Sequence, residues 1–314
     1  MAINNIIKKN FDLTPYTTFR IGGLAEFFTI VKNEPELIAA ADWAKAKKIP
    51  LHILSGGSNI LIVRKKVKGL VIKISGERHA IKKNQISCWA GANLTRLSVA
   101  AAKAGLSSLE WAYGIPGTVG GAVRGNAGAF GADISGNFLK AKAYDLASGK
   151  IIKLSKRECD FSYRGSMFKK NNNLIILEID LKVKPGETSE IKKIMDENLK
   201  RRLKIQPRQP SAGCVFKNLL FQEVLAQNKS LAHELEEQGL VRGGKIASGC
   251  LIDRLGLKGE IKGGAKISDL HANFIINTGQ ASAKDVVFLI NTAKKKVKSS
   301  YKIILHEEVQ YFGE

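Results

Sequence analysis

The residues best suited to chemistry are glycines, and they are concentrated in one stretch of the chain. Residues 114–131, GIPGTVGGAVRGNAGAFG, contain seven glycines among eighteen residues and a single charged side chain. Glycine lets main-chain N–H groups approach a ligand without an intervening Cβ, and successive N–H groups facing a concavity bind anions such as phosphate. A flexible linker is the alternative, but linkers are rich in serine and polar residues, whereas Ile115, Val119, Val123 and Phe130 suit burial. We therefore interpret the stretch as a phosphate-binding loop.

A second glycine turn lies upstream, where Gly56, Gly57, Ser58 and Asn59 separate two short apolar segments typical of strands. Neither turn has the GxGxxG or GxxxxGKS/T spacing, so the dinucleotide-fold and P-loop fingerprints do not apply. Two small-residue loops of this kind could hold the two ends of one elongated, phosphate-bearing cofactor.

These two segments and five others resemble, in collinear order, the UDP-N-acetylenolpyruvoylglucosamine reductases, the MurB family of peptidoglycan synthesis. The segments are TPYTTFRIGG (14–23), IPLHILSGGSNILI (49–62), SLEWAYGIPGTVGGAVRGNAGAFGADI (108–134), FSYRGSMFK (161–169), QPRQPSAGCVFKN (206–218), GLKGEIKGGAKISDLHANFIIN (256–277) and LHEEVQYFG (305–313). One such motif would be weak, but seven in order are specific. The resemblance implies an FAD enzyme that reduces the enolpyruvyl group of a UDP-sugar with hydride from flavin N5, after NADPH has reduced the flavin.

The resemblance assigns catalytic roles to three residues. Arg164 matches the arginine that meets the substrate carboxylate, a role suited to a charged, two-pronged donor. Cys214 occupies the position of the proton donor, which is more often serine. A thiol, with a reference pKa of about 8.5, is protonated at neutral pH yet more acidic than an alcohol. Glu308 matches the glutamate that assists this protonation, and Glu307 is its immediate neighbour. The structural alternatives are a surface salt bridge for Arg164 and a small buried apolar role for Cys214.

The resemblance also places the ligand contacts. Tyr163, Lys217 and Asn218 are expected at the substrate, the last two at the UDP diphosphate. The expected FAD contacts are Arg20, Gly56, Gly57, Ser58, Asn59, Gly114, Ile115, Pro116, Gly117, Thr118, Gly120, Gly121, Asn126, Ala127 and Gly128. No metal site and no disulfide framework is expected, because the four cysteines and five histidines lack the required spacing.

The elements that must position these residues suggest an α+β chain of three parts. The resemblance implies a two-part FAD-binding region of the PCMH/vanillyl-alcohol-oxidase type, at residues 1–75 and 76–204, and a C-terminal α/β substrate-binding domain at 205–300. Residues 301–314 are expected to return to the second FAD subdomain as a strand. Hydrophobic periodicity predicts helices at 34–48, 94–104, 191–203 and after a capping box at Ser282 and Asp285. It predicts strands at 51–54, 61–63, 70–74, 140–145, 151–154, 174–183 and 302–312.

Two departures from the family pattern stand out. An insertion at about residues 219–243 follows Asn218; it is amphipathic and predicted to be helical. A substrate lid, a self-association surface and a neutral addition all remain open for it. The short passage 167–187 leaves no room for the long tyrosine-bearing loop of the first subtype, so the chain resembles the second subtype.

The formal net charge of +22 invites a nucleic-acid hypothesis. The lysines are spread along the chain without interleaved aromatics, so solvated helix faces are the favoured explanation. Attraction of the anionic UDP-sugar and NADPH is the second explanation. No apolar run approaches a membrane helix, so we expect a soluble, cytoplasmic protein without nucleic-acid or membrane partners. The oligomeric state stays open, with a monomer favoured. Two functions compete with the reductase: an FAD-linked oxidoreductase of the same superfamily acting on another substrate, and a non-catalytic polyanion-binding protein.

Overall fold

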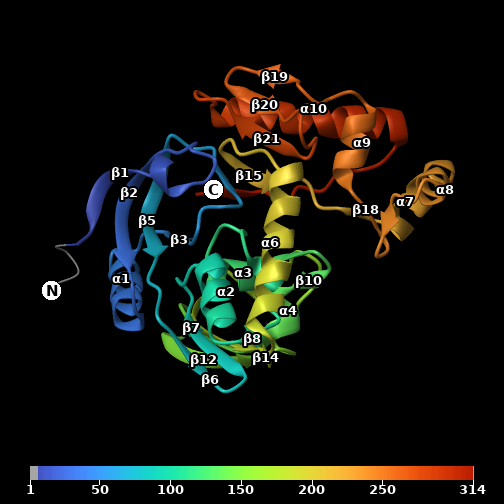
Figure 1. Cartoon of the computed structure of the whole chain (residues 1–314). Coiled ribbons are helices and arrows are strands. Elements are labelled where there is room, and N and C mark those ends of the chain that lie inside the picture. The colour runs from blue at the N-terminus through green and yellow to red at the C-terminus, as the bar shows by residue number, and fades with distance from the viewer. Residues whose placement is uncertain (1–5, 314) are drawn as a thin grey trace. The chain divides into compact units, whose positions relative to one another are not determined.

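The structure is a computed structural model that describes residues 6–313 (Figure 1). Residues 1–5 and 314, the ends of the expected first domain and of the expected terminal strand, lie outside the described residues. The described chain divides into two compact units, each built from separate segments. Unit 1 contains residues 6–12, 24–57 and 66–204, and unit 2 contains residues 13–23, 58–65 and 205–313.

The first sheet of unit 1 is largely parallel and carries helix α1. Its strands, in spatial order, are β1 (Lys8–Asp12), β2 (Leu24–Val31), β5 (Lys66–Ile74) and β3 (Leu51–Leu54), with β2, β5 and β3 parallel. Helix α1 (Glu34–Ala46) begins where Asn33 Oδ1 accepts the N–H of Glu36 at 3.0 Å, and Pro35 fits its first turn. The helix predicted at 34–48 is therefore confirmed, as is the strand at 51–54.

The second sheet of unit 1 is antiparallel. Its strands, in spatial order, are β12 (Lys150–Ser155), β11 (Phe138–Asp145), β13 (Leu174–Lys182), β7 (Gln85–Trp89) and β6 (His79–Lys82). The remaining elements of unit 1 are α2 (Leu94–Lys103), β8 (Leu106–Ser107), η3 (Glu110–Ala112), α3 (Val119–Gly125), β9 (Gly128–Ala129), β10 (Ala132–Asp133), α4 (Ile134–Asn137), α5 (Met167–Lys170), β14 (Lys184–Pro185) and α6 (Thr188–Ile205). Gly105, at φ +65°, follows α2 in the left-handed conformation expected of a helix end. The division of residues 1–204 into two FAD subdomains stays a prediction; each expected subdomain holds one of these sheets.

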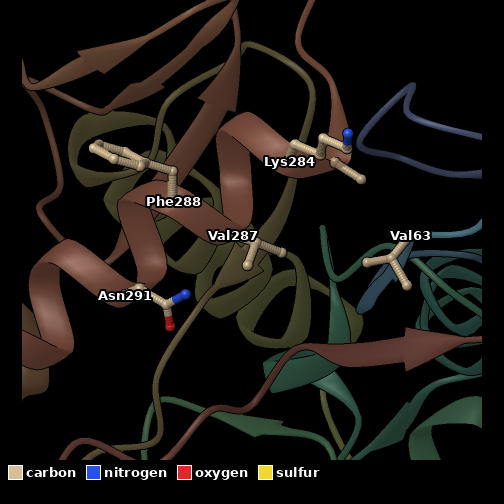
Figure 2. Close-up of a pocket in the computed structure, with 6 residues that line it drawn as sticks. Val63, Lys284, Val287, Phe288 and Asn291 are labelled. Carbon is tan, nitrogen blue, oxygen red and sulfur yellow. The ribbon is translucent and has the colours of Figure 1, made fainter.

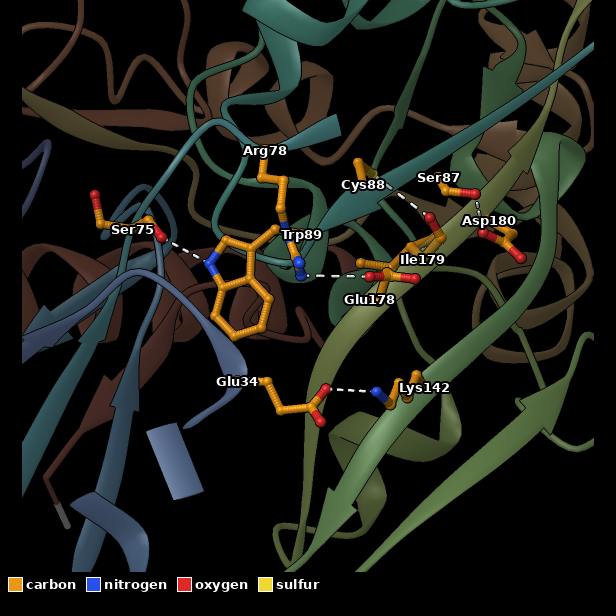
Figure 3. A network of polar contacts seen from close by, with 10 residues as sticks. All are labelled: Glu34, Ser75, Arg78, Ser87, Cys88, Trp89, Lys142, Glu178, Ile179 and Asp180. Carbon is orange, nitrogen blue, oxygen red and sulfur yellow. Dashed lines mark hydrogen bonds and ion pairs between the residues drawn. The ribbon is translucent and has the colours of Figure 1, made fainter. Parts of the chain in front are cut away.

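Polar contacts and one apolar core join the two sheets of unit 1. Figure 3 shows Trp89 on β7 donating its indole N–H to the carbonyl of Ser75 at 2.6 Å, and Lys142 on β11 paired with Glu34 at 2.6 Å. A buried indole N–H needs such an acceptor. The shared core contains Leu37 and Ile72 from the first part and Ile179 from the second, all fully buried.

Unit 2 centres on the sheet β15 (Ser211–Cys214), β21 (Phe274–Asn277), β20 (Ala265–Ile267) and β19 (Ile261–Lys262), in that order. Its other elements are η2 (Thr14–Tyr16), β4 (Ile60–Ile62), β16 (Leu219–Leu220), α7 (Phe221–Gln227), α8 (Lys229–Glu237), β17 (Val241–Arg242), β18 (Lys245–Ile246), α9 (Ser248–Arg254), α10 (Ala283–Tyr301) and β22 (Gln310–Phe312). Phe19 and Leu61, from the two early segments, are buried in the same core as Leu251 and Leu289. No helix within residues 6–313 is long and apolar enough to cross a bilayer.

The terminal strand predicted at 302–312 is wrong over most of its length. Only β22 is a strand, and it pairs in parallel with β4 rather than with any strand of residues 76–204. The alternating pattern has another cause: Ile303, Leu305 and Val309 are buried in the unit 2 core while Ile304 is exposed. The alternation of apolar residues therefore reflects which side chains are buried. It does not mark a continuous strand paired by backbone hydrogen bonds.

The segment at 219–243 is partly helical, as predicted, and it packs on unit 2. Val224 of α7 and Leu231 and Leu235 of α8 are buried in the unit 2 core. Asn228 begins α8 by accepting the N–H of Leu231 at 3.0 Å, and its Nδ2 donates to the carbonyl of Tyr301 at 2.9 Å. Its two ends are short strands, since β16 and β17 both pair with β18.

Candidate active site

The two glycine turns singled out in the sequence meet in unit 1. A Cβ on Gly56 would clash with Cα of Gly117, so the two backbones touch at a distance that only glycine permits. Gly57 at φ +64° and Gly117 at φ +126° adopt conformations that favour glycine. We call this junction, residues 55–57 with 117–121, the glycine cradle.

Side chains as well as backbone hold the glycine cradle together. Ser55 Oγ and Thr118 Oγ1 share a short hydrogen bond, and Thr118 Oγ1 also accepts the N–H of Gly121 at 3.3 Å as the cap of α3. A Cβ on Gly121 would lie 2.7 Å from Ser55 Oγ, and one on Gly120 would lie 2.8 Å from the Ala90 Cβ. Gly120 and Gly121 of α3 are therefore required, because their neighbours leave no room for a Cβ.

The rest of the predicted glycine-rich stretch lies on either side of this cradle in the chain. Gly114 has φ +77°, and the carbonyl of Ile115, which precedes Pro116, accepts the Thr95 hydroxyl at 3.0 Å. Asn126, buried and at φ +43°, ends α3 in the left-handed region and directs Ala127 and Gly128 into the hairpin of β9 and β10.

Arg164 is positioned by the turn that carries it. Ser162 and Gly165 exchange backbone hydrogen bonds at 3.0 and 3.1 Å, which leaves Arg164 at the tip with φ +56°. Its Nη2 donates to the carbonyl of Gly128 at 3.2 Å. Asn126 Nδ2 donates to the carbonyl of Ser162 at 2.9 Å. Unit 1 therefore brings Arg164 together with the 126–128 segment that was predicted to contact the flavin.

Tyr163 flanks this arginine. The Arg164 guanidinium carbon lies 5.4 Å from the centre of the Tyr163 ring, within the range of a cation–π contact. The ring thus restrains the guanidinium from one side, while the Gly128 carbonyl restrains it from another.

In unit 2 the backbone of Glu308 contacts that of Val215, the residue after Cys214. Cys214 ends β15, opposite Phe274 of β21, directly after Gly213 at φ +78°. The carbonyl of the next residue, Val215, accepts the N–H of Glu308 at 2.7 Å. Residues far apart in sequence are therefore held side by side.

Glu307 and Glu308 have different surroundings. Glu307 Oε1 pairs with Lys294 at 2.7 Å, and its Oε2 accepts the Tyr311 hydroxyl at 2.7 Å. These contacts fix Glu307 as an anchor between α10 and β22. This favours Glu308, not Glu307, as the carboxylate for chemistry.

Asn59 and Lys217 contact the segment at 306–308, whereas Arg20 contacts Asn277. Asn59, which follows Ser58 in the second glycine turn, donates from Nδ2 to the carbonyl of Glu308 at 3.0 Å. The N–H of Lys217, next to Asn218, donates to the carbonyl of His306 at 2.9 Å. Arg20 is exposed at φ +55°, and its carbonyl accepts Asn277 Nδ2 at 3.4 Å.

Sequence reasoning missed one residue of this region, Asn273. Its side chain, 2% exposed, accepts the N–H of Phe216 and donates to the Phe216 carbonyl, both at 2.9 Å, and so holds the backbone two residues beyond Cys214. His271 Nδ1 accepts the N–H of Asn273 at 3.2 Å, while burial and then nearby Lys258 lower the pKa of His271 and keep the ring neutral. The motif HANF at 271–274 was the available signal, but it was not given a role.

Comparison with known proteins decides the family. Residues 206–312 match the family described as UDP-N-acetylenolpyruvoylglucosamine reductase, C-terminal domain, and residues 25–155 match an FAD binding domain. The reductase of that name from Prochlorococcus marinus (strain NATL2A) is 39% identical, with 98% of each chain covered. That from Synechococcus sp. (strain RCC307) is 37% identical over 98% of this chain and 94% of the relative. The crystal structure of UDP-N-acetylenolpyruvylglucosamine reductase (MurB) from Thermus caldophilus matches with a TM-score of 0.75 at 32% identity, covering 98% of both chains.

This chain belongs to the UDP-N-acetylenolpyruvoylglucosamine reductase family. It is accordingly a flavin-dependent oxidoreductase whose cofactor is FAD. The fold class expected from the sequence is confirmed: an α+β chain with an FAD-binding region and a C-terminal domain of the reductase family. The glycine cradle fits this cofactor, because the turn at Gly56 packs so closely on Gly117 that no Cβ separates them, and successive glycine N–H groups of this kind bind a diphosphate.

Two cavities of this reductase-family chain lie away from the residues named above. One, of about 290 Å³ in unit 2, is lined by Val63 and by the α10 residues Val287 and Phe288 (Figure 2). The α10 residues Lys284 and Asn291 also line it. The other, of about 670 Å³ in unit 1, is lined by residues of η3, the β9–β10 turn, β13, β14 and α6. None of the predicted site residues lines either cavity.

Proposed function

We propose that this chain catalyses the FAD-dependent, NADPH-driven reduction of UDP-N-acetylglucosamine enolpyruvate to UDP-N-acetylmuramate in peptidoglycan precursor synthesis. The observation that carries the proposal is the hydrogen bond from the N–H of Glu308 to the carbonyl of Val215, the residue after Cys214, within a reductase-family chain. The reaction is assigned to the cytoplasm, where UDP-sugars and NADPH are both present.

The proposed chemistry makes three demands on the protein. Adding hydride to one carbon of the enolpyruvyl double bond moves negative charge onto the other carbon and its carboxylate. A cation must face the carboxylate, a proton donor must face the receiving carbon, and water must be kept away. FAD held by the glycine cradle would supply the redox chemistry that links NADPH to the substrate.

Arg164 is proposed to bind the substrate carboxylate. Its turn and the Gly128 carbonyl hold the guanidinium in place before substrate arrives. Such pre-organisation matters because a charged donor acts best when it need not reorient during the reaction. Tyr163 supports this orientation, and Lys217 and Asn218 are proposed to bind the UDP diphosphate.

Cys214 is proposed to hold the proton and deliver it from Sγ. Glu308 is proposed to support this protonation. Asn59 and Val215 hold its backbone in place through hydrogen bonds to its carbonyl and its N–H. A thiol is a stronger acid than the serine of most relatives. Glu307 takes no part in the chemistry, because Lys294 and Tyr311 bind both of its oxygens.

The test is NADPH oxidation by the purified, FAD-loaded protein. We expect oxidation that depends on added UDP-N-acetylglucosamine enolpyruvate, with UDP-N-acetylmuramate formed in equal amount. UDP-N-acetylglucosamine, which lacks the enolpyruvyl group, is the matched control and should give no turnover. NADPH oxidation with no UDP-N-acetylmuramate formed would assign the flavin to another substrate.

A further inference from the structure

Lys73 lies directly behind the glycine cradle, at the carboxyl edge of the parallel sheet in unit 1. It is the second-last residue of β5 and pairs in register with Leu54, the last residue of β3. Ser55 follows Leu54 and begins the glycine cradle. Ligands of open parallel sheets bind beyond this edge, so the position is one that a cofactor reaches.

The ammonium group of Lys73 is bonded to the cradle itself. Its Nζ donates to the carbonyl of Ser55 in a short hydrogen bond. Ser55 Oγ in turn bonds Thr118, the residue after Gly117. One lysine therefore contacts the first turn of the cradle directly and the second turn through one serine.

The charge of Lys73 has no counterion among residues 6–313. Within residues 6–313 the partner of its Nζ is the Ser55 carbonyl, and no acidic group contributes to its pKa. Burial lowers the pKa of Lys73, with no acidic neighbour to oppose the effect. Burying an ammonium is costly unless an opposite charge compensates it, so an anion bound at the cradle would remove a cost already built into the unliganded protein.

We propose that Lys73 is the counterion of the FAD diphosphate. The inference rests on the glycine cradle being the diphosphate site. A lysine ammonium has three donors; one is used on Ser55, and the others remain for an anion. The glycine N–H groups would supply the directional hydrogen bonds and Lys73 the positive charge. In a P-loop, which this sequence lacks, the phosphate-binding lysine belongs to the glycine-rich loop itself. Here the lysine lies on β5, outside both glycine turns.

The test compares two methionine variants of the same strand. Lys73→Met removes the half-buried ammonium and keeps the apolar stem, while Lys68→Met removes an exposed charge from β5 and is the matched control. FAD is titrated into apoprotein and the quenching of flavin fluorescence gives Kd. A charge-assisted hydrogen bond contributes about 1.5–3 kcal/mol, so Lys73→Met should weaken FAD binding about 10- to 100-fold while Lys68→Met changes Kd less than about threefold.

Two further measurements separate binding from folding. Apoprotein melting should be unchanged or higher in Lys73→Met, because an uncompensated buried charge is removed, whereas the rise in melting temperature on adding FAD should shrink. ADP, which carries a diphosphate but no flavin ring, should compete with FAD more weakly in the variant by a similar factor. Lys73→Arg should keep most of the affinity, since it keeps the charge.

The outcomes distinguish this inference from the cradle assignment. An unchanged FAD Kd in Lys73→Met, or an equal loss in Lys68→Met, would overturn the role of Lys73. Gly56→Ala introduces a clash with Gly117 that must displace the cradle and should abolish FAD binding, with circular dichroism of the apoprotein separating this loss from unfolding. If Gly56→Ala weakens binding and Lys73→Met does not, only the Lys73 inference fails. If neither variant weakens binding, the cradle is not the diphosphate site and both ideas fail.

Discussion

Cys214 combines a reactive side chain with a position fixed by neighbouring backbone. Phe274 lies opposite it in the sheet, and the Val215 carbonyl ties the next residue to Glu308. Burial raises the pKa of Cys159 to about 12 and also raises the pKa of Cys88 and Cys250, so these three thiols ionise less readily than a free cysteine. A thiol reagent should therefore report mainly on Cys214.

We expect Cys214→Ala to lower turnover about 10²- to 10⁴-fold, the usual contribution of a positioned general acid. Bound FAD and its reduction by NADPH should be unchanged, as measured by flavin absorbance in single-turnover experiments. Cys214→Ser should retain much of the activity and resist inactivation by iodoacetamide. Normal turnover in Cys214→Ala would show that the proton comes from elsewhere.

Substitutions of Glu307 and Glu308 should have different effects on kcat and on the melting temperature. Glu308→Gln should lower kcat with little effect on the melting temperature, because its proposed role is in protonation. Glu307→Gln should lower the melting temperature while leaving kcat nearly unchanged, because Glu307 holds Lys294 and Tyr311. Loss of kcat in Glu307→Gln with normal kinetics in Glu308→Gln would reverse the assignment.

At the scale of elements, α10 shows how a local signal fixes a helix start. Ser282 N donates to Asp285 Oδ2 at 2.9 Å, and Asp285 N donates to Ser282 Oγ at 3.2 Å, which together form the predicted capping box. The hydrogen bond from the Ser282 hydroxyl, and then that from its backbone, lower the pKa of Asp285 below 3.8. The capped helix therefore favours the ionised carboxylate.

This shift predicts a pH-dependent stability. Because the folded pKa of Asp285 lies below its unfolded value, its stabilising effect is complete above pH 3.8 and is lost as pH falls through the folded pKa. Asp285→Asn should melt below the wild type at neutral pH, and the difference should narrow under acid conditions. Thermal melts of both proteins at several pH values check this; a difference that grows on acidification would contradict it.

At the scale of the whole molecule, unit 2 is assembled from three separated segments. Phe19 and Ile21 come from residues 13–23 and Leu61 from residues 58–65, and all three are buried in the unit 2 core. β22 also takes its partner, β4, from the second of these segments. Residues 205–313 therefore share their core and a strand pairing with two earlier segments of the chain and do not form a separate folding unit.

We expect a fragment of residues 205–314 to be unfolded or only partly folded. Removing a buried phenylalanine or leucine typically costs about 2–5 kcal/mol, and the fragment lacks three large apolar side chains of its core, against a total stability of about 5–15 kcal/mol for a domain. Circular dichroism should show no cooperative melt, whereas the full-length protein should melt cooperatively. A cooperative melt of the fragment would show that the early segments are dispensable.

The sequence by itself determined the features that depend on neighbouring residues. Helix starts at Asn33 and Ser282, the helix end at Gly105 and the glycine-rich turns follow from local dihedral preferences and hydrogen bonds within a few residues. Its collinear motifs also indicated the family and the fold class. These properties are encoded along the chain and need no knowledge of distant partners.

The tertiary structure alone decided which distant residues meet. The contact of Gly56 with Gly117, the ammonium of Lys73 behind both, and the pairing of Val215 with Glu308 all join segments remote in sequence. The terminal strand was wrongly predicted for the same reason, since the alternation of residues 303–309 fits a buried loop as well as a strand. Periodicity reports which side chains are buried, but hydrogen-bond partners are set by how sheets and turns pack.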